Sequence, residues 1–291
     1  MPLILENVSY FYPSHDRSLN PALSNVSLAI NDGEFIGIMG HTGCGKTTLI
    51  QLMAGLLVPA SGKVLLDGKD INGKEYNKAE LRKNVGIVFQ FPEYQIFEST
   101  VEKDLAFGLK HSGLPQSEVK DRIKWALETM GFSFDKTYSL PPLSLSGGEK
   151  RRIAIAGALV TRPRFLIFDE PIAGLDPMGS RSFLSTVSRL NSEGTTIIIV
   201  SHNAGALGEY ADRLLVFDKA ALVMDGAVKD VFSDIEKLKA LQLNAGTPKT
   251  IADMLTRRGI PMPATVTSYA GLLCALKSHL KGDAPQGAIS A

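Results

Sequence analysis

The chain has 291 residues, of which 44% are hydrophobic and 21% are charged, and its net charge is +1. This length suffices for one large or two modest domains, and the balanced charge gives no sign of a nucleic-acid-binding surface. No apolar run approaches the roughly 18 residues that a membrane helix needs. The first residues lack the features of a signal peptide. We therefore expect a cytoplasmic protein that reaches a membrane only through partner subunits.

The N-terminal part predicts short strands separated by turns. The turns are indicated by Asn31-Asp-Gly33 and Asp67-Gly68, which are typical turn sequences. The predicted strands cover residues 3–12, 25–30, 35–39 and 63–67.

The third of these strands leads into a glycine-rich loop. Gly40 to Thr47 read G-H-T-G-C-G-K-T, between the apolar strand 35–39 and an apolar helix starting near Thr48. This is the strand, loop and helix context of a phosphate-binding loop, in which backbone N–H groups and the helix N-terminus face phosphate oxygens. The spacing predicts Lys46 on the β- and γ-phosphates of ATP and the Thr47 hydroxyl on Mg²⁺. The predicted ATP-binding residues here are Gly40, His41, Thr42, Gly43, Cys44, Gly45, Lys46, Thr47 and Thr48.

Cys44 lies inside this loop, and the only other cysteine is Cys274, so no disulfide framework is expected. A thiol at a helix N-terminus tends toward a lowered pKa, which predicts a reactive Cys44 whose alkylation blocks activity. The alternative is a small, inert side chain that fills space.

Three continuous apolar runs predict parallel strands buried on both faces, at residues 85–89, 165–168 and 196–201. Polar residues that can act on a nucleotide follow each strand, at the edge where ligands bind in open α/β sheets. Asp169 suits the Mg²⁺ shell, and Glu170 is placed to orient or deprotonate the attacking water. Gln90 can offer its amide oxygen to Mg²⁺, and His202 can contact the γ-phosphate.

Residues of about 92–162 predict a mostly helical lobe, with Val119, Ile123 and Leu127 at helical spacing between 117 and 130. Within it, Leu145–Glu149 reads L-S-G-G-E before a helix of about 153–161. A serine and two glycines at a helix start form a second phosphate-binding end. One nucleotide cannot use two distant phosphate sites, so this end would serve the ATP of another chain in a head-to-tail dimer. Its predicted ATP-binding residues are Ser146, Gly147, Gly148 and Glu149.

A late strand pair is predicted at 213–217 and 221–224, and the character of the sequence changes near residue 244. Helices are expected from Thr247 and over about 268–280, and a small polar tail at 282–291 is expected to be disordered. The predicted organisation is an α/β ATPase domain at 1–243, a helical extension at 244–281 and the tail.

These motifs, in this order and together with Ala173-Gly-Leu-Asp176, resemble those of the ATP-binding cassette (ABC) ATPases over residues 3–235. The resemblance implies an ABC nucleotide-binding domain with a phosphate-loop core, an antiparallel β part and an inserted helical lobe. It also implies that Ser146 contacts the partner's γ-phosphate, that Asp176 lies at the dimer interface and that Tyr12 stacks on adenine. Tyr10 and Phe11 remain alternatives to Tyr12. Glu149 departs from the more usual glutamine.

A narrower resemblance begins after Gln90, where Phe91–Glu98 reads F-P-E-Y-Q-I-F-E and Thr100–Gly108 reads T-V-E-K-D-L-A-F-G. This stretch looks like the second type of ATPase subunit of the energy-coupling factor (ECF) importers of vitamins and metal ions. That family implies a heterodimer with a sister ATPase, a transmembrane coupling protein and a small substrate-binding membrane subunit, with the ATPases at the cytoplasmic face of the membrane. It also implies a groove after Gln90 for coupling helices, in which Glu93, Glu98 and Glu102 meet arginines, and a C-terminal dimerisation extension.

Two alternatives remain at this stage. One is the ATPase of a different ABC transporter, and the other is an ABC protein that acts outside transport. The sequence does not encode the transported compound, and the choice between homodimer and heterodimer depends on the resemblance alone.

Overall fold

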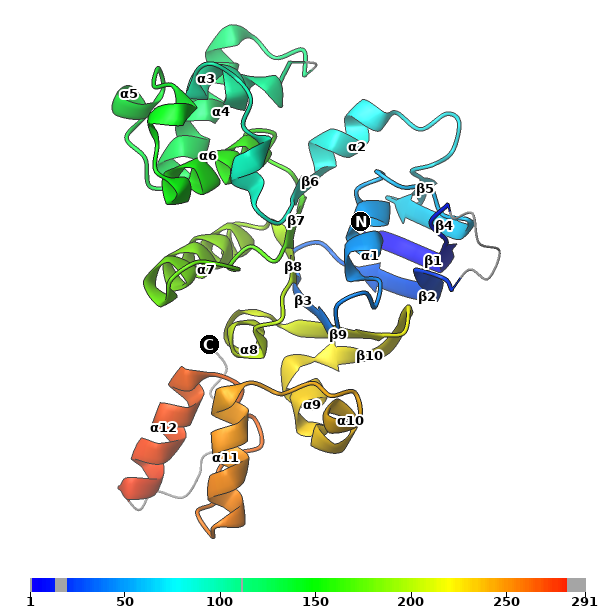
Figure 1. Cartoon of the computed structure of the whole chain (residues 1–291), viewed down its shortest axis with the longest axis vertical. Helices are drawn as coiled ribbons and strands as arrows, with labels where there is room; N and C mark the ends of the chain where they lie inside the picture. The colour runs from blue at the N-terminus through cyan, green and yellow to red at the C-terminus, as the bar shows by residue number, and fades with distance from the viewer. Residues whose placement is uncertain (1, 14–19, 111, 282–291) are drawn as a thin grey trace. The chain divides into compact units, whose positions relative to one another are not determined.

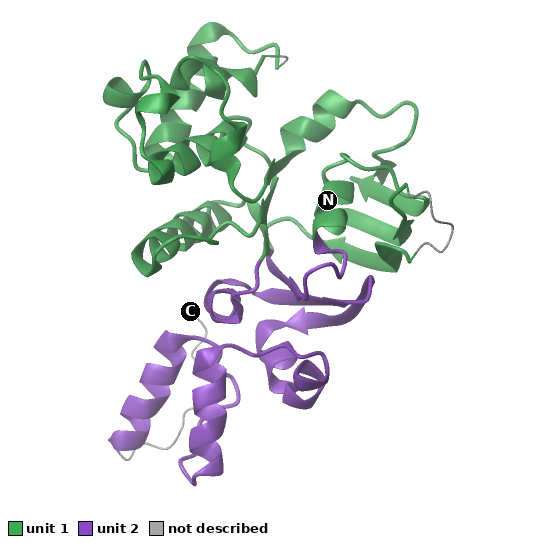
Figure 2. Ribbon diagram, in the orientation of Figure 1, with its two compact units in different colours: residues 1–34, 47–200 green, residues 35–46, 201–291 purple. Residues whose placement is uncertain are grey.

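The computed structural model describes residues 2–13, 20–110 and 112–281 (Figure 1). Its contacts divide the chain into two compact units, shown in Figure 2. Unit 1 comprises residues 1–34 and 47–200, and unit 2 comprises residues 35–46 and 201–291. The boundary at 243/244 remains a prediction, and the expected disordered tail lies outside the described residues.

Unit 1 contains an antiparallel sheet in the order β2-β1-β4-β5. Leu3, Leu5 and Val8 of β1 point into the core, and this near-alternation of buried and exposed residues is typical of a sheet with one covered face. The strands are β1 Leu3–Tyr10, β2 Leu23–Ile30, β4 Ser61–Leu66 and β5 Lys69–Asp70. Helix α1, Lys46–Met53, has its first residue in unit 2 and the rest in unit 1.

Unit 1 also contains three parallel strands in the order β8-β7-β6: β6 Val85–Val88, β7 Phe165–Asp169 and β8 Thr196–Val200. Every residue of β7 and β8 is buried, as the continuous apolar runs predicted. Helix α2, Lys78–Asn84, leads into β6, and helix α7, Pro177–Ser192, follows β7. Phe183 of α7 packs edge to face on Phe168, with ring centroids 5.3 Å apart.

The helical lobe expected near 92–162 belongs to unit 1. Its four α-helices are accompanied by 3₁₀ turns at Pro92–Gln95 and Pro142–Ser144. Apolar residues at helical spacing, among them Leu105, Ile123 and Ile153, are 0–1% exposed and form its interior. The helices are α3 Val101–Phe107, α4 Gln116–Thr129, α5 Phe134–Thr137 and α6 Gly147–Leu159.

Unit 2 is built on three strands in the order β3-β9-β10, where β3 and β9 run parallel and β9 and β10 antiparallel. The two C-terminal helices pack through Ala252, Val266 and Leu272, so both predicted helices of the extension are present. Gly208 of α8 is needed for close packing, since a Cβ there would lie 2.5 Å from the Thr267 carbonyl oxygen. The elements are β3 Phe35–Gly40, α8 Ala204–Tyr210, β9 Arg213–Asp218, β10 Ala221–Ala227, α9 Val228–Ser233, α10 Ile235–Ala240, α11 Thr247–Arg257 and α12 Tyr269–Leu280.

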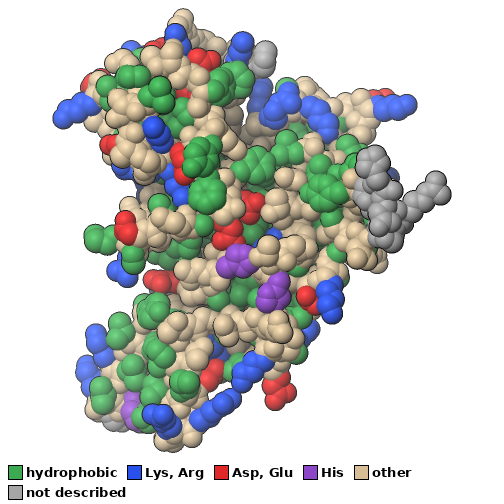
Figure 3. Space-filling view, in the orientation of Figure 1, with side chains coloured by type: hydrophobic (Ala, Val, Ile, Leu, Met, Phe, Trp, Pro, Cys, Tyr) green, Lys and Arg blue, Asp and Glu red, His purple; other side chains and the backbone are tan. Residues whose placement is uncertain are grey.

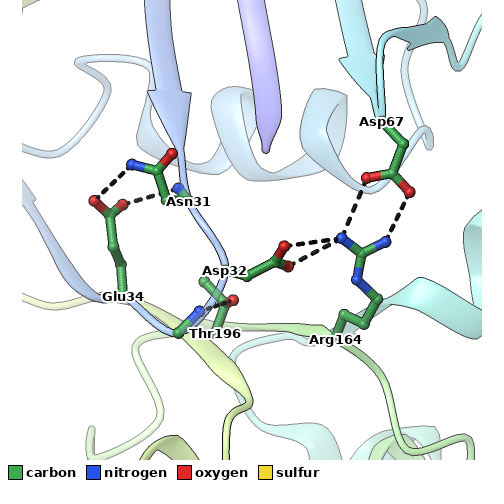
Figure 4. Close-up of polar contacts among 7 residues, drawn as sticks. Asn31, Asp32, Glu34, Asp67, Arg164 and Thr196 are labelled. Carbon is green, nitrogen blue, oxygen red and sulfur yellow. Dashed lines mark hydrogen bonds and ion pairs between the residues drawn. The ribbon is translucent and has the colours of Figure 1, made fainter. Parts of the chain in front are cut away.

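Arg164, just before β7, joins two turns of the antiparallel sheet to the parallel strands of unit 1 (Figure 4). Its guanidinium lies 3.0 Å from the Asp32 carboxylate and 2.8 Å from that of Asp67. Nearby, Gly33 donates its backbone N–H to the buried Thr196 hydroxyl at 2.8 Å. These contacts fix the turn that leads from β2 toward the phosphate-binding loop.

The Arg164 cluster predicts acid-sensitive stability. Burial raises the pKa of Asp32, but neighbouring hydrogen bonds and positive charges, those of Arg164 among them, together outweigh burial and hold that pKa below its ordinary value. A carboxyl whose folded pKa is lowered contributes stability above its unfolded pKa of about 3.9, and this contribution is lost as pH falls through the folded value. Asp32→Asn should lower Tm by about 1–3 °C at pH 7, and the difference should shrink as the pH falls below the unfolded pKa of about 3.9. Thermal unfolding at pH 7 and at acidic pH tests this, with Asp121→Asn on α4 as control; a pH-independent difference would contradict it.

Candidate functional site

The glycines of the phosphate-binding loop have backbone conformations that favour glycine. Gly40, Gly43 and Gly45 have φ angles of +146°, +79° and +105°. A Cβ on Gly40 would lie 2.3 Å from the Phe217 carbonyl oxygen and 2.6 Å from Cys44 Sγ. The backbone of the loop is therefore tightly packed at Gly40. Such packing is expected of a loop whose backbone N–H groups converge on an anion.

Lys46 begins α1 and is only 7% exposed. Its ammonium donates to the carbonyl oxygens of Gly40 and His41, at 2.7 Å each. The imidazole of His41 contacts the Leu241 carbonyl oxygen at 2.6 Å. The loop's own carbonyls thus hold the positive charge of Lys46 against the loop, where an incoming phosphate can take their place.

Thr47 and Asp169 form a contact within unit 1 that joins α1 to the end of β7. The Thr47 hydroxyl donates to Asp169 Oδ2 at 3.0 Å, and Asp169 is 7% exposed. Hydroxyl and carboxylate oxygens are suitable ligands for a hard cation such as Mg²⁺. Within the described ranges there is no cluster of three or more His, Cys, Asp or Glu side chains that could hold a metal.

Glu170 follows Asp169 in a backbone conformation that is unusual for a residue with a side chain. Its φ is +48°, in the left-handed region, and its N–H donates to the Val200 carbonyl oxygen at 3.0 Å. Such conformations cost about 1–3 kcal/mol and tend to occur at functional sites. The conformation directs the chain sharply away from the sheet directly after the two acidic residues.

Arg151, a residue that the sequence analysis missed, supports this turn. It is 6% exposed and donates to the carbonyl oxygens of Ala173 at 2.8 Å and Glu170 at 3.4 Å, and also to that of Pro171. Burial lowers its pKa, while the charge of Glu93 opposes this shift. The available signal was its position on α6, four residues before the buried Ile155, which places a cation in an apolar stripe.

Replacement of Arg151 tests this support. Arg151→Met should lower the free energy of unfolding by about 2–4 kcal/mol, because the turn loses its charged donor to buried carbonyls. Arg152→Met is the matched control: Arg152 is exposed and, among the described residues, donates to the Met130 carbonyl oxygen at 3.2 Å and lies 4.5 Å from the centroid of the Phe132 ring. Urea unfolding of both variants gives the comparison, and an equal loss would show that Arg151 has no special role.

Ser146 caps the N-terminus of α6 together with Glu149. The Ser146 hydroxyl and backbone N–H both donate to Glu149 Oε2, at 2.7 and 2.8 Å, and the Glu149 N–H donates back to the hydroxyl at 3.4 Å. These hydrogen bonds lower the pKa of Glu149. Gly147 and Gly148 are exposed beside the cap. The hydroxyl predicted to meet a γ-phosphate is therefore engaged by Glu149 in this structure.

The remaining predicted site residues are placed as follows. Tyr12 lies beside α1, with its hydroxyl 3.2 Å from Thr48 Oγ1 and its ring 46% exposed. Tyr10 ends β1 and is half-buried, whereas Phe11 is 39% exposed. Asp176 caps α7 by accepting from the Gly179 N–H at 2.8 Å. Gln90 after β6 and His202 after β8 are both exposed, and the Mg²⁺-binding role of Gln90 and the catalytic role of His202 remain predictions.

The lowered pKa predicted for the Cys44 thiol is wrong, while the effect of its alkylation on activity stays a prediction. Cys44 is 5% exposed, and burial raises the pKa of its thiol, an effect that the neighbouring Lys46 opposes only in part. The helix N-terminus was expected to dominate, but removal of the thiolate from water has the larger effect.

This burial predicts selective alkylation. Iodoacetamide at pH 7 should label the exposed Cys274 at least about tenfold faster than Cys44 in the native protein, because the thiolate is the reactive form and Cys44 is inaccessible. Peptide mass spectrometry over a time course measures both rates, and unfolding in urea should equalise them. Faster labelling of Cys44 than of Cys274 would contradict this expectation and support a reactive Cys44 thiol.

The chain is similar in sequence to known proteins. A family model described as ABC transporter matches residues 23–173. The chain is 43% identical to the energy-coupling factor transporter ATP-binding protein EcfA2 of Caldanaerobacter subterraneus subsp. tengcongensis, over 97% of this chain and 99% of that protein. It is 41% identical to EcfA2 of Symbiobacterium thermophilum, over 97% and 98%.

Solved structures show the same similarity. CbiO1 of Clostridium perfringens, part of the ABC transporter complex cbiONQ, aligns with a TM-score of 0.72 and 35% identity, over 88% of this chain and 96% of that one. The dimeric ATP-binding cassette MJ0796, in a post-hydrolysis state with ADP and Pi, aligns with a TM-score of 0.67 and 26% identity, over 78% and 98%.

Proposed function

The chain belongs to the ABC transporter family, among the ATP-binding subunits of energy-coupling factor transporters, and we propose how its residues hydrolyse ATP and couple this reaction to membrane partners. The observation that carries the proposal is the 3.0 Å contact between the Thr47 hydroxyl and Asp169, which within unit 1 joins α1 to the strand end that bears Glu170. The relatives match nearly the whole of this chain, so the proposal concerns all of its described parts.

The phosphates of ATP bind the loop of residues 40–48. Backbone N–H groups of this loop donate to the phosphate oxygens, and Lys46 exchanges its two carbonyl contacts for the β- and γ-phosphates. Tyr12, beside α1, supplies a ring for adenine.

The donors present also fit Mg²⁺. Thr47 and Asp169 provide hydroxyl and carboxylate oxygens, with Gln90 as a further oxygen ligand, and Mg²⁺ in such sites takes its other ligands from phosphates and water. When bound, Mg²⁺ neutralises charge that develops on the phosphate oxygens.

Hydrolysis then depends on Glu170 and His202. Glu170 orients a water molecule and accepts its proton as the water oxygen bonds to the γ-phosphorus, and the bond between that phosphorus and the β,γ-bridging oxygen breaks to give ADP and phosphate. His202 donates to the γ-phosphate and keeps the water in line. Support by Arg151 holds the turn after Glu170 in place.

Each ATP needs a second subunit. We propose that Ser146–Glu149 of this chain face the γ-phosphate of ATP bound to a sister ATPase, with Asp176 at the interface, so that the working form is a heterodimer with two composite sites. The dimeric state of the similar cassette MJ0796 supports this arrangement. The Ser146 hydroxyl would have to turn from Glu149 toward the phosphate when the dimer closes.

The membrane partners are proposed to be a transmembrane coupling protein and a small substrate-binding subunit, with this chain at the cytoplasmic face. Searching the described residues finds no helix long and apolar enough to cross a membrane. The segment after Gln90 would meet the coupling protein. Within it, one oxygen of Glu93 is buried and faces the charge of Arg151. Burial, and then the hydrogen bond and charge of Glu102, raise the pKa of Tyr138 to about 12, so Glu102 is already engaged. Glu98 is therefore the carboxylate of the three that best fits a partner contact.

The test is purification of the tagged chain from membranes of its native host in mild detergent, with mass spectrometry of the proteins that co-purify. Recovery of a second ATPase and two membrane proteins is expected. Recovery of a homodimer with other permease subunits would support the ATPase assignment but contradict an importer of the energy-coupling factor type. Recovery of ribosomal or chromosomal proteins would contradict a role in transport.

A further inference from the structure

The linker of residues 241–246 joins α10 to α11 and lies in unit 2 together with two segments of the candidate ATP site. These segments are the phosphate-binding loop as far as Lys46 and the stretch after β8 that begins with Ser201 and His202. His41 is half-buried and His202 is exposed, and Figure 3 shows histidine side chains at the surface of the molecule. The contacts of the linker with both segments can therefore be followed within one unit.

The first end of the linker holds the phosphate-binding loop. Leu241 is the C-terminal cap residue of α10, and its carbonyl oxygen accepts a hydrogen bond from His41 Nε2 at 2.6 Å. The His41 carbonyl oxygen in turn accepts from the Lys46 ammonium at 2.7 Å. His41 thus connects the linker, which its side chain contacts, to the cation that its backbone holds.

The second end of the linker packs against the start of α8. Gly246 has a φ of +80°, and a Cβ on it would lie 3.0 Å from the Gly205 nitrogen and 3.2 Å from the Ala204 carbonyl carbon. A side chain at this position would have to displace these backbone atoms by a few tenths of an ångström. The linker and α8 therefore touch backbone to backbone, two residues after His202.

Hydrogen bonds tie the start of α8 to the turn that carries His202. The Asn203 N–H donates to the buried Ser201 hydroxyl at 3.1 Å, and the Ala204 N–H donates to the His202 carbonyl oxygen at 3.2 Å. The side-chain oxygen of Asn203 also caps α8 by accepting from the Ala206 N–H at 3.0 Å. Because closely packed and bonded segments transmit strain, a shift of the first turn of α8 also moves His202.

We propose that the linker is a positioning element of the ATP site. It fixes the phosphate-binding loop through His41, and it fixes the turn of His202 through the packing of Gly246 on α8. The loop and His202 contact the same γ-phosphate in the proposed reaction, so their relative position decides whether the attacking water lies in line. This inference rests on the proposed function, since it uses the proposed role of His202.

Gly246→Ala tests the contact with α8, and Gly259→Ala is its matched control. Gly259, between α11 and α12, has a φ of +85°, and a Cβ on it would meet no atom of the described residues within 4 Å. Both replacements therefore strain the backbone, but only one presses on α8. Gly246→Ala should lower kcat at least about fivefold and change KM for ATP less than about twofold, since it leaves the phosphate-binding loop in place. Gly259→Ala should keep the wild-type kcat.

His41→Leu and His41→Gln test the other end of the linker independently. Leucine cannot donate a hydrogen bond, whereas the glutamine amide can donate to the Leu241 carbonyl oxygen in place of the imidazole. His41→Leu should raise KM for ATP about three- to tenfold, the usual effect of one lost hydrogen bond. His41→Gln should recover most of this loss.

All variants are measured in the intact membrane complex from the native host, with a Gln in place of the sister ATPase's catalytic carboxylate. Phosphate release then reports only the site that contains Glu170. Hydrogen exchange in the same complexes gives a readout that does not depend on turnover. The N–H groups of Ala206 and Leu207, which bond to Asn203 at the start of α8, should exchange faster in Gly246→Ala than in Gly259→Ala.

The outcomes separate the two proposals. His202→Ala in the same complex should lower kcat. If it does, and Gly246→Ala matches Gly259→Ala in kcat and in exchange, the positioning role is overturned while the proposed function stands. If His41→Gln binds ATP no better than His41→Leu, the contact of the linker with the phosphate-binding loop is overturned. If the wild-type complex releases no phosphate, the proposed function itself fails.

Discussion

Replacement of Glu170 by Gln is expected to leave ATP binding intact and to slow hydrolysis about 10²–10⁴-fold. The amide has nearly the same shape as the carboxylate, so it can keep the left-handed backbone at φ +48° and the N–H contact to Val200. It cannot accept a proton from the attacking water. The measurement is phosphate release at saturating ATP, together with the equilibrium affinity for ATP.

Glu193→Gln is the control for this variant. Glu193 is the C-terminal cap residue that follows α7 in unit 1 and lies 3.9 Å from the guanidinium of Arg189, one turn earlier. It has no proposed role in the reaction. Turnover of this control should match the wild type. Near-normal turnover of Glu170→Gln would remove Glu170 from catalysis, and loss of ATP binding would point instead to a collapsed loop.

Replacement of Lys46 by Ala should weaken ATP binding about 10–100-fold, because charge-assisted hydrogen bonds to phosphate are worth roughly 1.5–3 kcal/mol. The buried ammonium also closes the loop through the carbonyl oxygens of Gly40 and His41, so some loss of stability should accompany it. Titration of a fluorescent ATP analogue gives the affinity, and thermal unfolding gives the stability.

Lys46→Arg separates these two effects. The guanidinium keeps the charge, but its planar fork does not match the compact position of an ammonium between two carbonyls. We expect intermediate ATP affinity for this variant. Wild-type affinity in Lys46→Ala would contradict the assignment of the loop.

The parts of the fold that sequence predicted best are those set by local pattern. Continuous apolar runs located β7 and β8, and the glycines and Lys46 located the phosphate-binding loop, because each depends on residues within one short segment. Thr247-Pro248 likewise located the start of α11, where Pro at the first turn leaves a clear signal, and an amphipathic stretch of about 268–280 located α12.

Contacts between segments that are distant in the sequence could not be predicted from it. The position of Arg151 in the apolar stripe of α6 was visible in the sequence, but its bonds to residues about twenty positions away were not, because they depend on α6 packing beside the turn after Glu170. The raised pKa of Cys44 follows from burial within the folded loop, which outweighs the helix N-terminus. The bond of the Ser146 hydroxyl to Glu149 was readable as a capping box, but the phosphate-binding interpretation of the same residues concealed it.

Phosphate release by the intact membrane complex tests the central claim most directly. The complex is purified from the native host through the tagged chain, in two forms that both carry a Gln in place of the sister ATPase's catalytic carboxylate, so that only the site containing Glu170 can turn over. We predict Mg²⁺-dependent release of phosphate from ATP with the wild-type chain, and at least about a hundredfold less with Glu170→Gln. Equal rates in the two complexes would contradict the claim that this chain hydrolyses ATP to drive a membrane importer.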